Sequence, residues 1–295
     1  MFKLLTLLLF IISLIKSHLP VVLWHGMGDT ANGMNDVAET IKDALGEDSY
    51  VYAIQIGQNM DEDRNFGFLD KIERQVLEVC KKLKSDGKLS HGFNAVGFSQ
   101  GGLFMRAYVQ ACNDPPVHNL VTFGSPHAGV AEIPKNIPTP VRFVLNAGVY
   151  LPYVQNRIVQ AQYFKDPHQI EKYLEFNIFL PIYNQELTAN MLYSTNMKVL
   201  KNFVMIQFEE DNMIVPKESA WFGFVDEDGN TISFKEQSFY FNDTLGLKTL
   251  DKKKRLAFET WPGQHMQISL EKFRAEIVEK YFINDLDTDT YFDDL

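Results

Sequence analysis

Short apolar runs alternate with helical patterns along most of the chain. The runs are four to seven residues long and lie at residues 19–24, 50–56, 92–96, 120–123 and 203–208, and a last strand is expected at 256–260. Runs of this length and composition are typical of strands that are buried on both faces of a sheet. We therefore predict a strand in each run.

Apolar residues recur at helical spacing between several of these runs. One set is Ile72, Val76, Val79, Cys80 and Leu83, a second is Leu103, Phe104, Ala107, Tyr108 and Ala111, and a closing helix is expected over residues 270–282. Strands that alternate with helices predict the α/β class, with a mostly parallel central sheet, helices on its faces and right-handed crossovers.

The alternation breaks from about residue 131 to residue 195. Prolines gather there, aromatic residues are frequent, and no strand-like run is present. We predict that this stretch is an inserted, largely helical cap, and that the core domain around it extends over residues 18–283.

The N-terminal residues have the pattern of a secretory signal peptide. Lys3 precedes an apolar run from Leu4 to Ile15, and the small residue Ser17 follows it. The pattern predicts a signal peptide over residues 1–17, cleaved between Ser13 and Leu19. A membrane span needs about 20 apolar residues, and this run is shorter. No later stretch is long and apolar enough to span a membrane, so we expect a soluble mature protein without stable membrane insertion.

Composition and charge narrow the class of protein further. The 295 residues are 45% hydrophobic, which is enough for one large core, and the formal net charge is −10. Five aspartates lie in residues 284–295, where we expect a solvated acidic tail. A nucleic-acid-binding protein draws most of its affinity from basic residues against phosphate. Because the chain is acidic and has no basic stripe, we exclude nucleic acid as a partner.

Two cysteines, Cys80 and Cys112, are present. An even number of cysteines in a secreted chain usually indicates a disulfide. A zinc site would need more soft ligands at short spacing, so we expect no metal. The sequon that begins at Asn242 predicts a glycosylation site and agrees with the secretory route.

The segment from Gly97 to Gly101 matches the nucleophile elbow, G-x-S-x-G, of α/β hydrolases. It lies between the strand predicted at 92–96 and the helix that follows, which is the context that the motif requires. Ser99 is therefore the candidate nucleophile. At the N-terminus of a helix, backbone N–H groups favour the negative charge that develops during acyl transfer.

A serine hydroxyl needs a base and an acid that orients the base. In this fold the acid and then the histidine follow the serine in the chain. His265 is the last of seven histidines and lies in a loop after the last predicted strand, so it is the candidate base. Glu209, Glu210 and Asp211 follow the strand at 203–208. We favour Asp211, which precedes an apolar turn that would partly bury it, and keep Glu210 as the alternative.

The loop after the first strand, from His25 to Gly28, is where the second oxyanion donor of α/β hydrolases comes from. We expect the backbone N–H groups of Met27 and Gln100 to form the oxyanion hole. His25 precedes the serine, so we expect it to brace this loop. His127 lies in a Gly-Ser-Pro-His stretch that resembles a lipase segment, and there we expect structural support.

Five separated stretches together resemble the palmitoyl-protein thioesterases: Val22–Asp29, Gly92–Gly102, Leu145–Gly148, Ile158–Tyr163 and Trp221–Phe224. The likeness runs from Leu19 to about Phe282. It implies hydrolysis of long-chain acyl thioesters on cysteines of S-palmitoylated proteins or peptides, in lysosomes, without a metal or cofactor. The nucleophile, acid and base of the family match Ser99, Asp211 and His265.

The resemblance also implies that the cap helps to shape an acyl groove and that Cys80 pairs with Cys112. The chain departs from the family pattern in the stretch from Gly124 to His127, which is closer to the lipases. The alternative hypothesis is therefore a secreted lipase or carboxylesterase that acts on oxygen esters. A third hypothesis, an inactive lipid-binding module, predicts a missing triad member, and none is missing.

Overall fold

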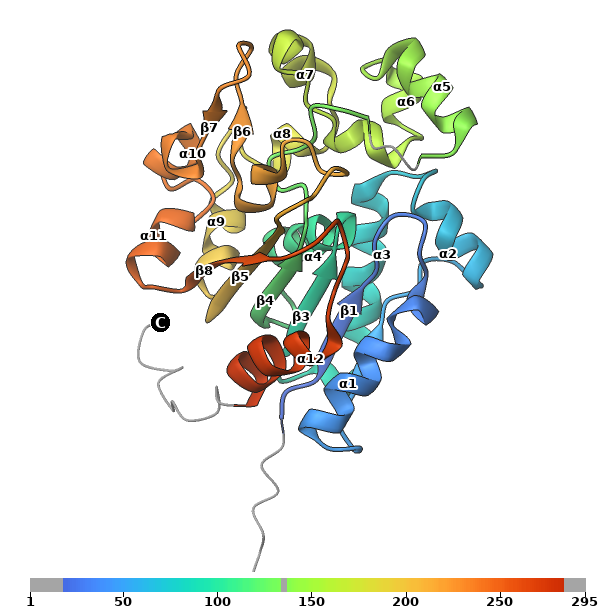
Figure 1. Cartoon of the computed structure of the whole chain (residues 1–295), viewed down its shortest axis with the longest axis vertical. Helices are drawn as coiled ribbons and strands as arrows, with labels where there is room; N and C mark the ends of the chain where they lie inside the picture. Colours follow the sequence, from blue (N-terminus) through green and yellow to red (C-terminus); the bar gives the residue numbers. More distant parts are fainter. Residues whose placement is uncertain (1–17, 134–136, 284–295) are drawn as a thin grey trace, which may run out of the picture.

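A six-stranded parallel sheet forms the centre of the computed structural model, which describes residues 18–133 and 137–283 (Figure 1). The strands are β1 Val21–Trp24, β2 Val51–Ala53, β3 Phe93–Phe98, β4 Val117–Phe123, β5 Asn202–Phe208 and β8 Leu256–Trp261. Their order across the sheet is β2-β1-β3-β4-β5-β8, and each neighbouring pair is parallel. The α/β class and the α/β-hydrolase fold predicted from the sequence are confirmed.

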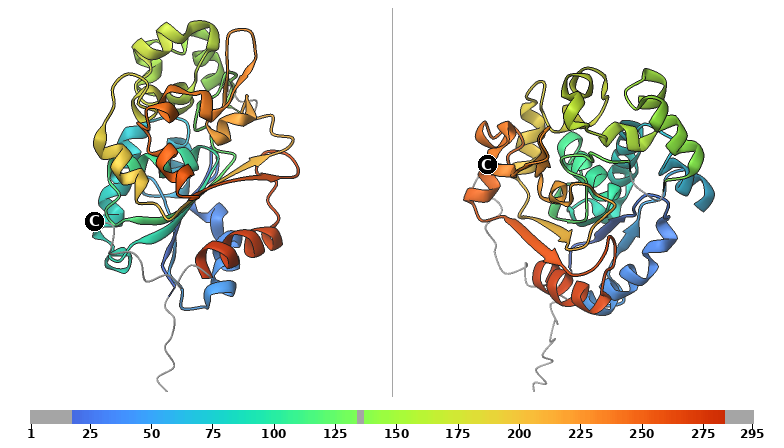
Figure 2. Two further views of the ribbon diagram at one scale, coloured as in Figure 1. Left: turned by 90° about the vertical axis from the view of Figure 1, so that its left-hand side faces the viewer. Right: turned by 45° about the horizontal axis from the view of Figure 1, so that its top comes forward.

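Helices cover both faces of the sheet because successive strand residues point to opposite sides. Val22 and Trp24 of β1 join the core cluster beneath α3 (Ile72–Ser85) and α4 (Gln100–Ala111). Val21 and Leu23 join the other cluster, beneath α1 (Asn35–Leu45) and α12 (Leu270–Phe273). Figure 2 shows α1 and α12 on one side of the sheet and α3 on the other.

Two helices differ from the sequence expectation. The predicted closing helix is α12, which continues as a π-helical segment, Arg274–Ile283. The sequence analysis missed α1, in which Val37 and Ile41 are the buried residues. Val37, Ala38, Ile41, Ala44 and Leu45 recur at helical spacing and pack on one core cluster, so the sequence pattern was sufficient to predict this helix.

The stretch between β4 and β5 is helical in the described residues. It contains α5 Thr139–Gly148, α6 Pro152–Gln155, α7 Ile170–Phe176, α8 Leu180–Tyr183 and α9 Met191–Lys198. Helices α5 to α8 lie above the sheet in Figure 1, and we call them the cap. Helix α9 packs against α4, on the face of the sheet.

A second excursion separates β5 from β8. It contains the antiparallel strands β6 Phe224–Val225 and β7 Thr231–Ile232, followed by α10 Ser238–Phe241 and α11 Leu247–Lys252. Strands of two residues and helices of four to six are too short to leave a periodic pattern, and the sequence analysis did not predict them. Asn242 is exposed at the end of α10.

Cys80, in α3, and Cys112, at the end of α4, form a disulfide with Cα atoms 6.1 Å apart. The bond joins the two helices on one face of the sheet. The predicted signal peptide (1–17) and acidic tail (284–295) lie outside the described residues. Within those residues, no helix is both long and apolar enough to cross a membrane.

Candidate active site

Ser99 sits on a sharp turn between β3 and α4. Its backbone has φ 53° and ψ −125°, a conformation that residues other than glycine rarely adopt. A Cβ at Gly97 would overlap the backbone of Gly102, and a Cβ at Gly101 would overlap the carbonyl groups of Trp24 and His25. The two glycines of the motif are therefore needed for close backbone approach, and they let the turn lift Ser99 above the sheet.

Ser99, His265 and Asp211 form one line of hydrogen bonds. His265 Nε2 lies 2.9 Å from Ser99 Oγ, and His265 Nδ1 lies 2.7 Å from Asp211 Oδ2. An ionised carboxylate can only accept, so Nδ1 carries the proton and Nε2 is left to accept from the serine hydroxyl. This is the tautomer that a general base for Ser99 requires.

The carboxylate of Asp211 is held in place. Its Oδ1 accepts from the backbone N–H groups of Met213, at 2.9 Å, and Ile214, at 3.0 Å. The side chain is 2% exposed, whereas Glu209 and Glu210 are exposed on the same loop. The apolar turn after Asp211 thus buries it, and Asp211 is the carboxylate of the three that meets His265.

The pairing of β5 with β8 explains why the acid and the base meet. The register continues beyond both strands, because Glu209 N–H donates to the carbonyl of Trp261 and Glu210 N–H donates to the carbonyl of Gly263. The two loops therefore leave the sheet side by side, although Asp211 and His265 are 54 residues apart.

The two predicted oxyanion donors flank Ser99. Gln100 is the first residue of α4, and Met27 lies in the loop after β1. In the described parts of the chain, neither backbone N–H donates to another protein group. Both groups are free to donate to an oxyanion. A Cβ at Gly26 would lie 3.2 Å from Ser99 Cβ, so the loop after β1 packs directly against Ser99.

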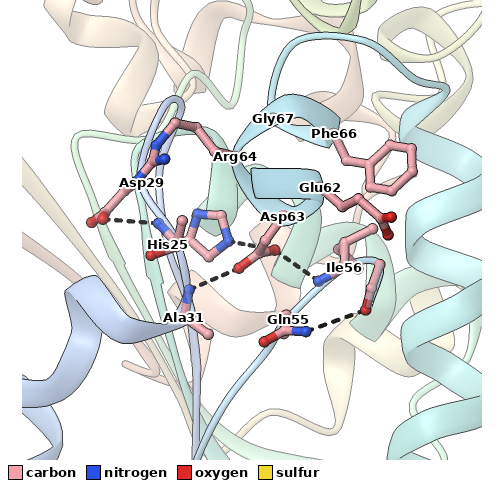
Figure 3. A network of polar contacts seen from close by, with 12 residues as sticks. His25, Asp29, Ala31, Gln55, Ile56, Glu62, Asp63, Arg64, Phe66 and Gly67 are labelled. Carbon is pink, nitrogen blue, oxygen red and sulfur yellow. Dashed lines mark hydrogen bonds and ion pairs between the residues drawn. The ribbon is translucent and has the colours of Figure 1, made fainter. Parts of the chain in front are cut away.

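His25 braces the oxyanion loop through Asp63 of α2 (Met60–Phe66), as Figure 3 shows. His25 Nε2 lies 3.1 Å from Asp63 Oδ1. The same carboxylate accepts from the backbone N–H groups of Ile56, at 2.7 Å, and Ala31, at 2.8 Å. Burial tends to raise the pKa of Asp63, but these hydrogen bonds and the adjacent imidazole outweigh it and lower the pKa below its ordinary value.

A family model described as palmitoyl protein thioesterase matches residues 20–265. The chain belongs to the palmitoyl protein thioesterase family. It is 40% identical over 274 residues to palmitoyl-protein thioesterase 1 of Caenorhabditis elegans, covering 90% of this chain and 92% of the relative.

Two further relatives are also named thioesterases. Palmitoyl-protein thioesterase 3 of Dictyostelium discoideum is 36% identical over 277 residues, covering 92% of each chain. A lysosomal thioesterase of Xenopus laevis is 29% identical over 269 residues, covering 88% of this chain and 90% of the relative. Among solved structures, the RedJ thioesterase of Streptomyces coelicolor is 13% identical, with a TM-score of 0.45 over 88% of this chain and 84% of that chain.

In this member of the palmitoyl protein thioesterase family, a cavity of about 630 Å³ opens at Ser99. Ser99 and His265 line it together with Met27, Ile214 and Tyr163. The cavity is therefore lined by the loop after β1, the loop after β5 and the segment between α6 and α7. Within the described residues, no group of three or more His, Cys, Asp or Glu side chains could hold a metal ion.

A buried network links Gln100, the residue after Ser99, to the segment that follows the cap helix α6. Gln160 Nε2 donates to the carbonyl of Gly67, at 2.8 Å, and to Gln100 Oε1, at 3.2 Å. Tyr163 Oη donates to the same Gln100 oxygen, at 3.3 Å. Sequence reasoning missed these partners and Asp63. Gln160 is one of two glutamines in the stretch Ile158–Tyr163, and Asp63 is one of three acidic residues in the first turn of α2, so neither stood out in the sequence.

His127 is a buried support residue. It is 0% exposed, its Nε2 lies 3.0 Å from Thr122 Oγ1, and its ring stacks on Phe222 with centroids 4.8 Å apart. Burial and the nearby Arg106 guanidinium lower its pKa well below the ordinary value, so the imidazole stays neutral. These contacts agree with the structural role expected from the sequence.

Proposed function

We propose that this chain is a palmitoyl-protein thioesterase that uses Ser99 as its nucleophile, His265 as its general base and Asp211 as the acid that orients His265. One observation carries the proposal: the unbroken hydrogen-bonded line Ser99–His265–Asp211 in a member of the palmitoyl protein thioesterase family. The substrates are long-chain acyl thioesters on cysteines of S-palmitoylated proteins or peptides.

The reaction is acyl transfer in two steps. Ser99 Oγ attacks the thioester carbonyl while His265 Nε2 takes the hydroxyl proton, and the N–H groups of Met27 and Gln100 stabilise the oxyanion. The C–S bond then breaks, and His265 returns the proton to the leaving sulfur. A cysteine thiol has a pKa of about 8.5, so its sulfur leaves readily.

In the second step His265 activates a water molecule, which attacks the ester of Ser99. The C–O bond breaks, the fatty acid is released, and Ser99 regains its proton. Asp211 stays ionised and stabilises the imidazolium that forms in each step. No step needs a metal or a cofactor.

The cap supplies apolar surface for the acyl chain in this proposal. A cluster of buried cap residues, including Val141, Leu145 and Ile158, has Met27 packed against it. We place the acyl groove along this cluster, because it reaches the oxyanion loop. The domain division that follows is a hydrolase core over residues 18–283 with a cap insertion at about 131–195.

We propose that the chain enters the secretory pathway and acts in lysosomes. Three features support this route: the signal-peptide pattern at residues 1–17, the disulfide between Cys80 and Cys112, and the exposed Asn242 as a glycan acceptor. The Xenopus laevis relative is named a lysosomal thioesterase.

The test combines labelling with a substrate comparison. A serine-directed fluorophosphonate should label the protein and should fail to label the Ser99→Ala variant. The protein should cleave a palmitoyl thioester on a cysteine peptide faster than the matched palmitoyl oxygen ester on a serine peptide. Ser99→Ala should retain less than about a thousandth of kcat. A preference for the oxygen ester would instead favour a lipase or carboxylesterase.

A further inference from the structure

The outer surface of α5 and α6 carries almost no charge. Ten residues between positions 138 and 157 are exposed, and Arg157 alone is charged; the others are Pro138, Thr139, Pro140, Phe143, Asn146, Ala147, Leu151, Pro152 and Tyr153. The outer face of a solvated helix is normally polar and charged. Helix α3 shows that pattern, with Glu73, Arg74, Lys81 and Lys84 exposed. The α5–α6 surface therefore departs from an ordinary solvated face.

Large apolar side chains project from this surface. Phe143 is 74% exposed, Tyr153 64% and Leu151 53%. Leu69, 51% exposed, adjoins them, because it is bridged to Ile158. A hollow of about 520 Å³ lies between Leu69, Val144 and Tyr153. Leu69 and Tyr153 line this hollow, and Leu151 lines a second one. Exposed apolar residues that lie beside hollows on two successive helices, rather than scattered singly, indicate a binding surface.

The charge of the surface differs from that of the whole protein. The formal net charge is −10, yet residues 137–165 contain no Asp or Glu. Lys165 is paired with Glu186 and is only 12% exposed, so Arg157 is the exposed cation of this surface. The Arg157 guanidinium lies over the Tyr153 ring, 4.2 Å from its centroid. Asp70 lines the hollow, but it is paired with Arg74. A negatively charged surface would thus repel most of the molecule and attract this part of it.

We propose that the α5–α6 surface docks on an anionic lipid bilayer. Aromatic and leucine side chains flanked by arginine are the composition that binds at the interface of a membrane. The choice of a bilayer over a protein rests on the proposed function, because the acyl chain of an S-palmitoylated substrate lies in the membrane. The buried cap cluster beneath this surface continues inward to Met27, so a docked molecule has an apolar path from the bilayer to the oxyanion loop.

Vesicle flotation tests the docking. The full chain should float with phosphatidylcholine vesicles that contain phosphatidylserine, and less with phosphatidylcholine alone. The Phe143→Ser, Tyr153→Ser double variant should bind at least about tenfold more weakly, because it loses two apolar anchors. Phe241→Ser is the matched control, since Phe241 is 61% exposed on α10 and lies outside the surface. Arg157→Gln should weaken binding to the anionic vesicles and leave the weak binding to neutral vesicles unchanged.

Activity on a water-soluble acyl thioester is measured in parallel. All these variants should cleave it at the wild-type rate, which shows that they are folded. A protein that binds vesicles but cleaves no thioester would overturn the proposed function and leave the docking intact. Absence of vesicle binding, or equal binding by the double variant and Phe241→Ser, would overturn the docking. The protein could also form a dimer and bind no vesicles, while the double variant is a monomer. The surface would then bind a second copy of the chain, and the docking on a bilayer would be overturned.

Discussion

The backbone N–H of Glu210 donates a hydrogen bond to the carbonyl oxygen of Gly263, at 3.0 Å. This bond lies beyond the ends of β5 and β8 and holds the acid loop against the base loop. It involves only the backbone of Glu210, whose side chain is exposed. The position of Glu210 therefore matters for the geometry of the site, whereas its carboxylate does not.

Replacing Asp211 by Asn should cripple the enzyme, because it removes the charge that holds the His265 tautomer and stabilises the imidazolium. We expect a loss of about 10⁴ in kcat, by analogy with other triads. Glu210→Gln and Glu209→Gln should each cost little, since exposed charges act only through screened fields. The measurement is kcat for the three variants, with folding checked by thermal melts. A crippled Glu210→Gln beside a near-normal Asp211→Asn would show that the acid is misassigned.

Asp63→Asn should loosen the oxyanion loop. The buried carboxylate binds His25 and two backbone N–H groups, so we expect a loss of about 2–4 kcal/mol in the free energy of unfolding. We also expect kcat to fall, since Met27 lies two residues from His25. Asp61→Asn is the matched control, because Asp61 is on the same helix and its side chain is 91% exposed. Equal melting temperatures for the two variants would contradict the bracing role.

The lowered pKa of Asp63 predicts how stability depends on pH. In the unfolded chain the carboxyl titrates near its ordinary value of 3.8, and in the folded protein it titrates lower. Its contribution is therefore fully present above about pH 3.8 and is lost as the pH falls through the lowered value. Denaturant melts of wild type and Asp63→Asn should converge as the pH drops below about 3.8. A constant difference at all pH values would argue against this linkage.

Gln160→Leu should impair catalysis as well as stability, because Gln160 links the residue after the nucleophile to the segment that follows α6. We expect kcat to fall about tenfold with KM little changed, which is less than the cost of losing an oxyanion donor outright. Gln155→Leu is the comparison variant: Gln155 is equally buried, but it bonds to Val149, Ala161 and Ile178 within the same insertion. Both variants should melt lower. If kcat falls equally in both, the link to Gln100 has no catalytic role.

Removing the disulfide should destabilise the protein without affecting catalysis. Cys80 and Cys112 are separated by 32 residues, a loop for which the chain-entropy model gives about 3–4 kcal/mol. The double variant Cys80→Ser, Cys112→Ser should show this loss in urea melts. Its kcat should match wild type while it is folded, because the bond lies at the far end of α4 from Ser99. A fall in kcat of the folded double variant would show that the disulfide also affects catalysis.

Sequence patterns were sufficient where a long buried segment or a strict motif was present. The run at 203–208 matches β5 to within one residue, because β5 is buried from Phe203 to Phe208. The strand expected at 256–260 matches β8 to within one residue as well, although β8 is an edge strand that is only partly buried. The elbow at Ser99 was equally predictable, because a side chain at either glycine of the motif would clash with neighbouring backbone.

The missed features depend on contacts between distant segments. Asp63 is an acidic residue in the first turn of a helix, a place where carboxylates are usually solvated. Only the fold brings His25 and the amides of Ala31 and Ile56 around it. The short elements between β6 and α11 were missed for another reason: they are held by packing, and their own lengths leave no period to detect.

The late position of His265 has a consequence for protein synthesis. A chain made through β5 and its loop carries Ser99 and Asp211 but no proposed base, because His265 follows β8. Ribosomes add roughly 5–20 residues per second, so the nascent chain remains inert for the roughly 3–11 s that the 54 residues from Asp211 to His265 require. A premature stop codon anywhere upstream of His265 should likewise yield an inert product, however much of the sheet it can fold.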